Sequence, residues 1–330
     1  MSSINTRISP RSRCRSRRGS ALLAVLWLTA ALSAIAFSVA NTVRGEIERT
    51  STASEGLRSY YLATGGVERA ILYMWWGNSA RNPDGSPKHY ERGIPRLNFV
   101  FPSGNVSVEI IPEISKLNIN SIRPEDLARL LLNVGASPDQ AREVTASIMD
   151  WRTPGPPGGP FDGFYSTAAP SFRSRHASIE EIEELLLVKG MTPELFYGTY
   201  IRDDRGLLVR RAGLRDCVSV YGTANGVDVN TVEPAVLFTL GLSPDQVAAI
   251  MDRRRAAPFR NPQDLVPFSK GAAVGRLVVG GATMFSLRST AQLRLPSGNF
   301  SDLRRTVTAL IKLREYGYNP PVETLRWYDN

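Results

Sequence analysis

An uncharged run near the N-terminus constrains this chain more than any other feature. The 25 residues from Gly19 to Val43 carry no charge, and a helix of that length, at 1.5 Å per residue, crosses the ~30 Å hydrocarbon layer of a bilayer. Small residues are spread through the run rather than gathered at its end, and the run is longer than the apolar part of a secretory signal peptide. The sequence therefore predicts a retained transmembrane helix over residues 20–43, with a cleaved signal peptide as the alternative. Its large apolar residues are Leu22, Leu23, Val25, Leu26, Trp27, Leu28, Leu32, Ile35, Phe37 and Val39.

Positive charge is concentrated ahead of this run. Six arginines and no acidic residue precede Gly19, so the leader carries six of the nine net positive charges. Arginines on this side of a span favour a cytoplasmic N-terminus, which places the body of the chain in the periplasm of a Gram-negative cell. Of the two cysteines, Cys14 lies in the leader and Cys217 beyond it, so a processed chain cannot form an intrachain disulfide.

Helical spacing continues beyond the uncharged run. Apolar residues recur at three, four, seven or ten residues, which predicts one helix of about fifty residues, half in lipid and half on a soluble domain. Four glycines, at 45, 56, 65 and 66, weaken such a helix by up to ~1 kcal/mol each. The expected buried stripe is Val43, Ile47, Leu57, Tyr61, Val67, Ile71 and Met74 or Trp75.

Strand patterns occur in two widely separated places. "NVSVEIIPEI" (105–114) alternates in hydrophobicity, and "MFSLRSTAQLRL", "PSGN" and "FSDLRRTVTALIKLRE" (284–315) predict a β-hairpin. Residues 78–98 are rich in Asn, Pro, Gly and Arg and predict a surface loop. The long helical pattern between the two β regions predicts one small antiparallel sheet interrupted by an inserted helical domain.

That inserted region contains an internal repeat. Residues 117–152 match residues 227–255 at an asparagine, a proline, an "SPDQ" segment and an "IMD" segment. Each "SPDQ" predicts a helix start with Ser137 or Ser243 as N-cap and the glutamine reaching back in a capping box. A third segment, "SIEEIEELLLVKGMTPELF", pairs Ser178 with Glu181 and restarts at Thr192. All three predict a helix, a glycine turn and a second helix.

A basic leader that ends in Gly19, a small residue at Ser20 and an uncharged helix resemble type IV prepilin-like proteins. "LATGGVERAILYMW" (62–75) is similar to the end of the N-terminal helix in K-type minor pseudopilins of the type II secretion system. Prepilins carry Glu at the fifth mature residue, where this chain has Ala24. K-type members lack this Glu, which fits a subunit at the tip of the pseudopilus. The resemblance implies cleavage between Gly19 and Ser20 by the prepilin peptidase, followed by methylation.

The resemblance also implies a fold and a function. The fold is α+β: a long helix on a small antiparallel sheet, with a large all-α inserted domain that contains helix-hairpin-helix-like repeats. The function is that of a tip subunit which helps initiate pseudopilus assembly and the export of folded proteins. The implied partners are other minor pseudopilins, the prepilin peptidase, the inner membrane, and the secretin or exported proteins. The expected segments are 1–19 (leader), 20–43 (span), 44–117 (first part of the core), 118–280 (insertion) and 281–330 (C-terminal β-hairpin).

Two other functions stay open at this point. One is a minor pilin of a type IV pilus, and the other is a membrane-tethered DNA receptor, because the repeats resemble the helix-hairpin-helix of DNA-binding proteins. Such hairpins place a second glycine near phosphate, where this chain has Ser137, Thr192 or Ser243, and acidic residues open the following helices. Nucleic acid is therefore not the expected partner. The best remaining basic patch is "DRRRAAPFR" (252–260), whose simpler interpretation is a solvated helix end.

K-type pseudopilins carry an Asp-rich loop associated with calcium, which implies a calcium site at Asp150 and Asp162. Calcium takes six to eight oxygens, so Glu180 and Glu181 would have to fold back, and the alternative is a loop stiffened by Pro and Gly without metal. We expect no enzyme, because the sequence contains no G-x-S-x-G elbow, phosphate loop or Cys-x-x-Cys pair. Both histidines, at 89 and 176, are expected to be solvated rather than catalytic.

Overall fold

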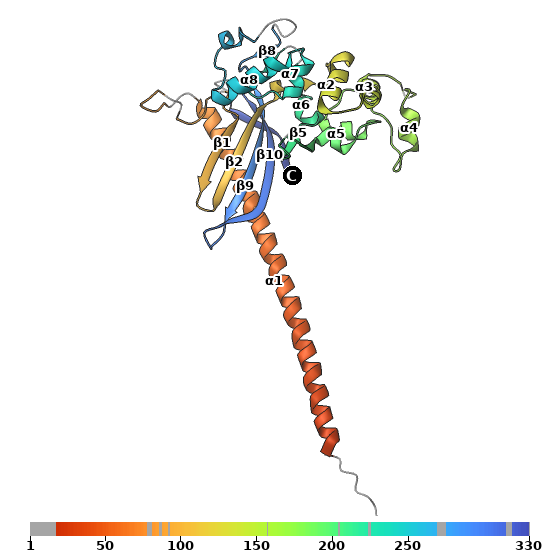
Figure 1. Ribbon diagram of the computed structural model, residues 1–330, viewed down its shortest axis with the longest axis vertical. Helices are drawn as coiled ribbons and strands as arrows, with labels where there is room; N and C mark the ends of the chain where they lie inside the picture. The colour runs from red at the N-terminus through yellow and green to blue at the C-terminus, as the bar shows by residue number, and fades with distance from the viewer. Residues whose placement is uncertain are drawn as a thin grey trace, which may run out of the picture. The chain divides into compact units, whose positions relative to one another are not determined.

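A computed structural model describes residues 18–77, 81–85, 88–91, 93–156, 158–203, 205–223, 226–268, 275–314 and 319–329. Most of the leader therefore lies outside the described residues. The chain divides into two compact units, Met1–Leu57 and Arg58–Asn330. Helix α1 (Arg18–Trp76) runs through both of them without interruption at its four glycines (Figure 1). The prediction of one long N-terminal helix is confirmed.

The second unit contains a five-stranded antiparallel sheet. Its strands are β1 (Arg96–Phe101), β2 (Gly104–Pro112), β9 (Met284–Arg294), β10 (Phe300–Leu313) and β11 (Val322–Asp329), in the order β1-β2-β9-β10-β11. Strand β2 pairs with β9 although more than 170 residues separate them. The interrupted antiparallel sheet is thus confirmed. Two details were wrong: β1 begins inside the expected loop 78–98, and three strands rather than a hairpin follow the insertion.

Helix α1 packs on one face of this sheet through small residues. Its buried positions in the second unit recur at intervals of one, three and four residues. A Cβ at Gly66 would lie 2.4 Å from Val106 Cγ1 and 2.7 Å from Ser289 Oγ, and the Ser289 hydroxyl donates a 2.7 Å hydrogen bond to the carbonyl of Ala63. Glycine at 66 was expected to weaken the helix, but its missing side chain permits the close approach of α1 to strands β2 and β9. The buried positions are Ser59, Leu62, Ala63, Gly66, Val67, Ala70 and Met74.

The expected stripe on α1 was partly wrong. Val67 and Met74 are buried, but Tyr61 and Trp75 are 64% and 53% exposed. By its size alone, Tyr61 is expected in a core. The sheet instead packs on the face of α1 that has small residues, where the backbones of the helix and the sheet can approach closely and leave few voids.

The insertion lies between β2 and β9. It begins with the 3-10 helix η2 (Glu113–Ser115) and continues with β3 (Leu117–Asn118), α2 (Pro124–Val134), α3 (Pro138–Arg152), α4 (Asp162–Thr167), η3 (Ile182–Leu187) and α5 (Pro193–Tyr197). The second part holds β4 (Thr199–Arg202), β5 (Leu208–Arg211), α6 (Leu214–Cys217), β6 (Val218–Ser219), β7 (Val227–Asp228), α7 (Pro234–Thr239), α8 (Pro244–Ala256), η4 (Pro262–Leu265) and β8 (Leu277–Val278).

The prediction that this insertion is all-α was wrong. It contains three two-stranded sheets: β3 with β6 and β7 with β8 are parallel, and β4 with β5 is antiparallel. The strands β3, β6, β7 and β8 have two residues each, which is too short to show an alternating pattern. Their pairing joins distant segments, Leu117 with Val218 and Val227 with Leu277.

The repeat seen in the sequence is also a repeat in the structure. The Asn120 amide forms two hydrogen bonds with the backbone of Ile179, at 2.8 and 2.9 Å. Asn230 does the same with Phe259, at 2.7 and 3.0 Å. Each copy thus uses its asparagine to hold the chain that follows its second helix.

An arginine closes each copy in the same way. The Arg152 guanidinium donates to the carbonyls of Ile119 and Ile122, and that of Arg254 donates to the carbonyls of Val229 and Val232. Because the isoleucines and valines are buried, the guanidinium supplies hydrogen bonds that water cannot supply. "DRRRAAPFR" is therefore not simply a solvated helix end.

The predicted helix starts are correct in part. Ser137, Ser243 and Thr192 all accept a hydrogen bond from the backbone of the third helical residue. Only Ser243 has the full capping box, because Gln140 donates to the carbonyl of Gly190 instead of reaching back.

The third segment differs from the prediction. Its first member, η3, is a 3-10 helix rather than an α-helix, and Glu181 rather than Ser178 stands at its N-cap. Glu184 accepts hydrogen bonds from the backbone amides of Glu180 and Glu181 at 2.9 and 3.0 Å, which closes this short turn.

Candidate functional site

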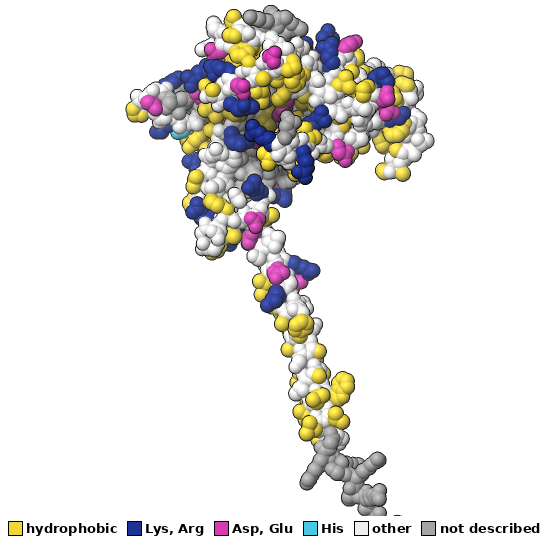
Figure 2. Space-filling model, in the orientation of Figure 1, with side chains coloured by type: hydrophobic (Ala, Val, Ile, Leu, Met, Phe, Trp, Pro, Cys, Tyr) yellow, Lys and Arg dark blue, Asp and Glu magenta, His cyan; other side chains and the backbone are white. Residues whose placement is uncertain are grey.

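The N-terminal part of α1 presents apolar side chains on its surface. The ten large residues expected to face lipid are 56–73% exposed, and Figure 2 shows hydrophobic side chains along this part of the helix. Exposure of this much apolar area to water is unfavourable by about 25 cal/mol per Å². Within the described ranges, α1 is the one helix that is long and apolar enough to cross a membrane, judged by length and composition alone. Gly19 and Ser20 lie in its first turn.

The C-terminal part of α1 exposes a second apolar stripe. Tyr61, Leu72 and Trp75 are 44–64% exposed, while the opposite face of the helix packs on the sheet. Their spacing of eleven and three residues keeps them on one face. The C-terminal part of α1 therefore has one face on the sheet and an apolar face that is exposed.

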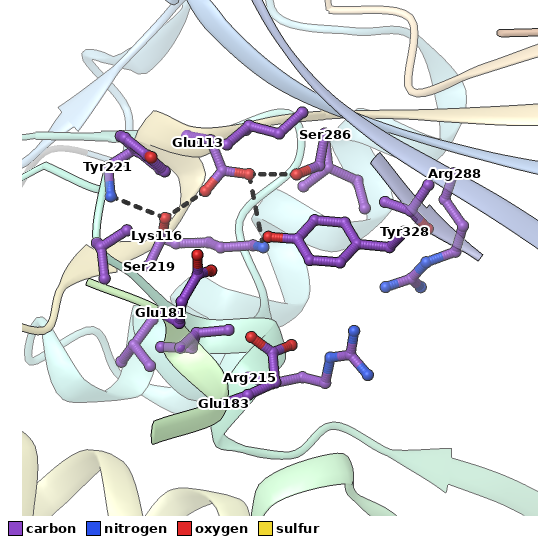
Figure 3. Close-up of a pocket in the computed structure, with 16 residues that line it drawn as sticks. Glu113, Lys116, Glu181, Glu183, Arg215, Ser219, Tyr221, Ser286, Arg288 and Tyr328 are labelled. Carbon is purple, nitrogen blue, oxygen red and sulfur yellow. Dashed lines mark hydrogen bonds and ion pairs between the residues drawn. The ribbon is translucent and has the colours of Figure 1, made fainter. Parts of the chain in front are cut away.

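A buried carboxylate joins the insertion to the sheet. Glu113, which is 3% exposed, starts η2 directly after β2. Its carboxylate accepts hydrogen bonds from the hydroxyls of Ser286 on β9, at 2.6 Å, and of Ser219 on β6. The Lys116 ammonium lies 3.7 Å from it. Figure 3 shows these groups converging on the carboxylate, so one side chain connects the start and the middle of the insertion to strand β9.

A small cavity of about 80 Å³ lies beside this carboxylate. Glu181 and Glu183 from the insertion, Arg288 from β9 and Tyr328 from β11 line it (Figure 3). Burial, together with the charges of Glu181 and Glu183, raises the pKa of Tyr328 to about 12. The phenol therefore stays protonated at physiological pH and contributes to packing rather than proton transfer.

The structure brings both expected acidic residues together with a histidine. Ligand atoms of Asp150, Asp162 and His176 all lie within 4.8 Å of one another. His176 Nε2 lies 3.0 Å from Asp162 Oδ1, and its Nδ1 lies 3.3 Å from the carbonyl oxygen of Asp150. The His176 side chain is only 9% exposed, and His89 packs on the rings of Tyr73 and Trp76. The expectation that both histidines are solvated was therefore wrong.

In this cluster Asp162 and His176 stabilise each other's charged forms, whereas burial disfavours the charged form of Asp150. Hydrogen bonds from the Ser174 hydroxyl, the Gly158 amide and His176 hold the pKa of Asp162 well below its usual range. The hydrogen bond to Asp162 raises the pKa of His176, and desolvation raises that of Asp150. The imidazolium form of His176 can donate from both ring nitrogens, to the Asp150 carbonyl and to the Asp162 carboxylate. It thereby holds two parts of the segment between α3 and η3 together.

Three comparisons with known proteins agree. A family model of type II secretion system protein K matches residues 114–198. The chain is 24% identical over 263 residues to the type II secretion system protein K of Klebsiella pneumoniae, which covers 73% of this chain and 76% of that protein. It also matches a chain in the crystal structure of the GspK-GspI-GspJ complex from the type 2 secretion system of enterotoxigenic Escherichia coli. That match has a TM-score of 0.54 and 16% identity, covers 86% of this chain and 99% of the other, and shows the fold.

Residues 114–198 thus match the type II secretion system protein K family, and most of the chain is similar in fold to a protein of a type 2 secretion system complex. The region matched by the protein K model contains α2, α3, α4, η3 and α5, with the Asp150, Asp162 and His176 cluster inside it. The matched region therefore includes the first copy of the repeat and the loop that follows it.

The side chains gathered in this protein K loop fit calcium poorly. Calcium takes six to eight oxygens, and Asp162 is already bonded to Ser174, His176 and two backbone amides. Glu180 and Glu181 form ion pairs with Arg175 and Arg326 instead of folding back. One buried oxygen, Asp150 Oδ2, has no hydrogen-bond partner. Calcium binding by Asp150 and Asp162 therefore stays a prediction.

Sequence reasoning missed two of the residues that define these sites. Nothing in the sequence around Glu113, other than its place just after a strand, indicated that its carboxylate would be buried. His176 could have been singled out only by asking which side chain faces the Asp150 and Asp162 pair, because it lies 14 residues from Asp162 in a loop of irregular sequence.

Proposed function

We propose that this chain is a minor pseudopilin at the tip of a type II secretion pseudopilus, where it helps initiate assembly and the export of folded proteins across the outer membrane. One observation carries the proposal: a long apolar N-terminal helix packs on an antiparallel sheet that is interrupted by the protein K insertion. A structural role in secretion, rather than catalysis, accounts for this arrangement.

The proposed location is the inner membrane. The apolar surface over residues 20–43 supports a single span, and the arginines before it support a cytoplasmic N-terminus with the remainder in the periplasm. We propose that the prepilin peptidase cleaves between Gly19 and Ser20. The mature chain would then enter the pseudopilus with its apolar helix innermost.

Other minor pseudopilins are the proposed partners. A protein with this fold is found in a complex named for GspK, GspI and GspJ. The exposed stripe with Tyr61, Leu72 and Trp75 supports packing against their helices. Ala24 supports a tip position. In other prepilin-like proteins a Glu at this place is expected to contact the next subunit, and a subunit at the tip has no such neighbour.

We propose the segment boundaries given by the sequence, except that the insertion begins with η2 at Glu113 and three strands follow it. Within it, the helix-hairpin-helix-like repeats act as packing units and as a docking surface for the secretin or exported proteins. Asp139 at the start of α3 is exposed, which disfavours phosphate at that helix end. Calcium at Asp150 and Asp162 stays a subsidiary proposal despite the poor fit of the side chains there, and isothermal titration of calcium into the full chain tests it.

Mass spectrometry of the membrane-extracted chain tests the processing step. The expected mass corresponds to a chain that begins at Ser20, and a Gly19→Leu variant should keep its leader. The Gly45→Ala variant is the matched control and should be processed normally. A native chain that begins elsewhere would contradict the cleavage site.

Cross-linking tests the assembly step. A photo-reactive residue in place of Leu72 should cross-link to the other minor pseudopilins of the same system, whereas one at the buried Val67 should not. Deletion of the gene should abolish export of the system's substrates, and reintroduction of the native chain should restore it. Normal export without the chain would contradict the proposed role.

A further inference from the structure

A cleft of about 1130 Å³ opens between the sheet and the insertion. It is larger than the ~300–1,000 Å³ of typical small-molecule pockets. One wall is the sheet face that points away from α1, and the other is formed by α5, β5, α6 and α8. Both walls belong to the same compact unit. Figure 2 shows Lys and Arg side chains gathered around this part of the surface.

The sheet wall presents two arginines around one carboxylate. Arg96, Glu109 and Arg288 stand side by side on β1, β2 and β9. The Glu109 carboxylate lies 2.5 Å from the Arg96 guanidinium and 3.6 Å from that of Arg288. Because one carboxylate neutralises only one of its two neighbours, this wall carries a net positive charge.

The insertion wall adds further cations. Arg215 lies with its guanidinium carbon 5.3 Å from the centre of the Tyr197 ring, and among the described residues no carboxylate lies within 4 Å of it. Arg210 pairs with Asp216 at 2.6 Å. Arg254 is occupied by the carbonyls of Val229 and Val232. Arg215 is therefore the guanidinium that is most available to a ligand.

Basic residues outnumber acidic ones over the whole cleft. Three carboxylates, those of Glu109, Asp216 and Glu233, face six arginines and Lys116. Apolar side chains, including Ile94, Ile111 and Tyr197, line the space between them. The arginines are Arg96, Arg210, Arg215, Arg254, Arg255 and Arg288.

We propose that this cleft binds an acidic peptide segment of a partner protein, with carboxylates on Arg215 and Arg288 and apolar side chains between the walls. Guanidinium groups bind carboxylates with two parallel hydrogen bonds, and these bonds are strong where water is partly excluded. A polyphosphate backbone fits less well, because the three carboxylates would repel its continuous charge and the apolar lining would stay unused. This inference does not depend on a place in the pseudopilus.

Fluorescence anisotropy of a labelled peptide tests the proposal on the full chain in detergent micelles. The probe is a short peptide in which Glu and Leu alternate, and its control has Gln in place of every Glu. We expect saturable binding of the Glu peptide that weakens as salt is raised, and at least about tenfold weaker binding of the Gln peptide. A Glu peptide that binds no better than the Gln peptide would overturn the proposal.

Two variants locate the binding. The double variant Arg215→Gln/Arg288→Gln should weaken binding of the Glu peptide at least about tenfold, and Thr306→Glu, which adds a negative charge to the lining without removing an arginine, should weaken it as well. Arg142→Gln, an exposed arginine of α3 outside the cleft, should leave it unchanged. Binding that survives both cleft variants would overturn the proposal, as would displacement of the Glu peptide by a DNA oligonucleotide at equal concentration.

Discussion

The two copies of the internal repeat use the same backbone hydrogen bonds but connect their elements differently. In both copies an asparagine pairs with the backbone that follows the second helix, and an arginine donates to two carbonyls before the first helix. In the first copy, residues 153–178 separate α3 from Ile179. In the second copy, only Ala257 and Pro258 separate α8 from Phe259.

This difference shows which part of the repeat can change. In the first copy the extra loop lies between α3 and Ile179. Because Asn120 binds the backbone of Ile179, the chain after the loop is held in the same way as in the second copy. Its own order comes from the Asp162 and His176 pair and from Tyr165, which is fully buried against Trp151 and Phe172. The second copy has no such loop and depends more on its asparagine.

Replacing the two asparagines should give the largest effect. Asn230 is buried, so Asn230→Ala leaves the amide and carbonyl of Phe259 without partners and should destabilise the chain by about 2–5 kcal/mol. Asn120 is half-buried, so Asn120→Ala should cost about 1–3 kcal/mol. Urea unfolding of the full chain in detergent, followed by tryptophan fluorescence, measures both. Ser121→Ala, an exposed neighbour, is the control, and equal losses from the two asparagines would contradict the difference between the copies.

The arginines should give the next effect, and here the copies should behave alike. Arg152→Met and Arg254→Met each remove two hydrogen bonds to buried carbonyls. They also remove a buried charge, whose cost is seen in the native chain, where burial lowers the pKa of both guanidinium groups. The net loss should be about 1.5–3 kcal/mol for each.

The Lys variants sharpen this test. One ammonium cannot span two carbonyls as a planar guanidinium does, so Arg152→Lys and Arg254→Lys should recover less than half of the loss. Hydrogen exchange of α2 and α7 assigns each loss to its copy. Full recovery by Lys would show that charge, rather than the two-carbonyl geometry, is what each copy needs.

The loop of the first copy should give a pH-dependent effect that the second copy lacks. A raised pKa at His176 contributes stability that is fully present below pH 6.5 and is lost as the pH rises through the raised value. A lowered pKa at Asp162 contributes stability that is present above pH 3.8 and lost as the pH falls through the lowered value. Protection of this loop from hydrogen exchange should therefore fall as the pH rises above 6.5.

The variant His176→Gln should remove that decline, and His89→Gln should leave it unchanged. The raised pKa of Asp150 makes its own contribution fall as the pH rises from 3.8, and His176→Gln should retain this lower part of the profile. Exchange of residues 153–178, corrected for the intrinsic effect of pH, gives the measurement. A native profile that is flat above pH 6.5 would contradict a structural role for the imidazolium.

Local patterns in the sequence were sufficient for some of these features. The "SPDQ" segments predict helix starts because a serine cap and the following proline act within four residues. The helical spacing of α1 and the alternation of β2 and β9 are likewise local. That the two β regions join in one antiparallel sheet was predicted, but the pairing of β2 with β9 was not.

Features that depend on distant partners could not be predicted in this way. Glu113 is defined by Ser219 and Ser286, which lie 106 and 173 residues away. The buried face of α1 was partly misassigned because small residues such as Gly66 pack on the sheet, whereas hydrophobic periodicity favours large ones such as Tyr61. His176 adopts a φ of 46°, which is uncommon for a residue other than glycine, and nothing in its neighbours indicates that it turns toward Asp162.

The helix caps should give the smallest difference between the copies. Ser243→Ala removes the hydroxyl that accepts from the Gln246 amide but keeps the backbone amide that donates to Gln246 Oε1, so it should cost about 1 kcal/mol. Ser137→Ala likewise removes a single bond, and Gln140 remains held by the carbonyl of Gly190, so it should cost about the same. Exchange of the Gln246 and Gln140 amides reports each cap directly, and the exposed Asp245→Asn and Asp139→Asn variants control for charge at the same helix starts. If Ser137→Ala costs more than Ser243→Ala, the contact between Gln140 and Gly190 does not replace the missing half of the box, and the first copy depends on its serine alone.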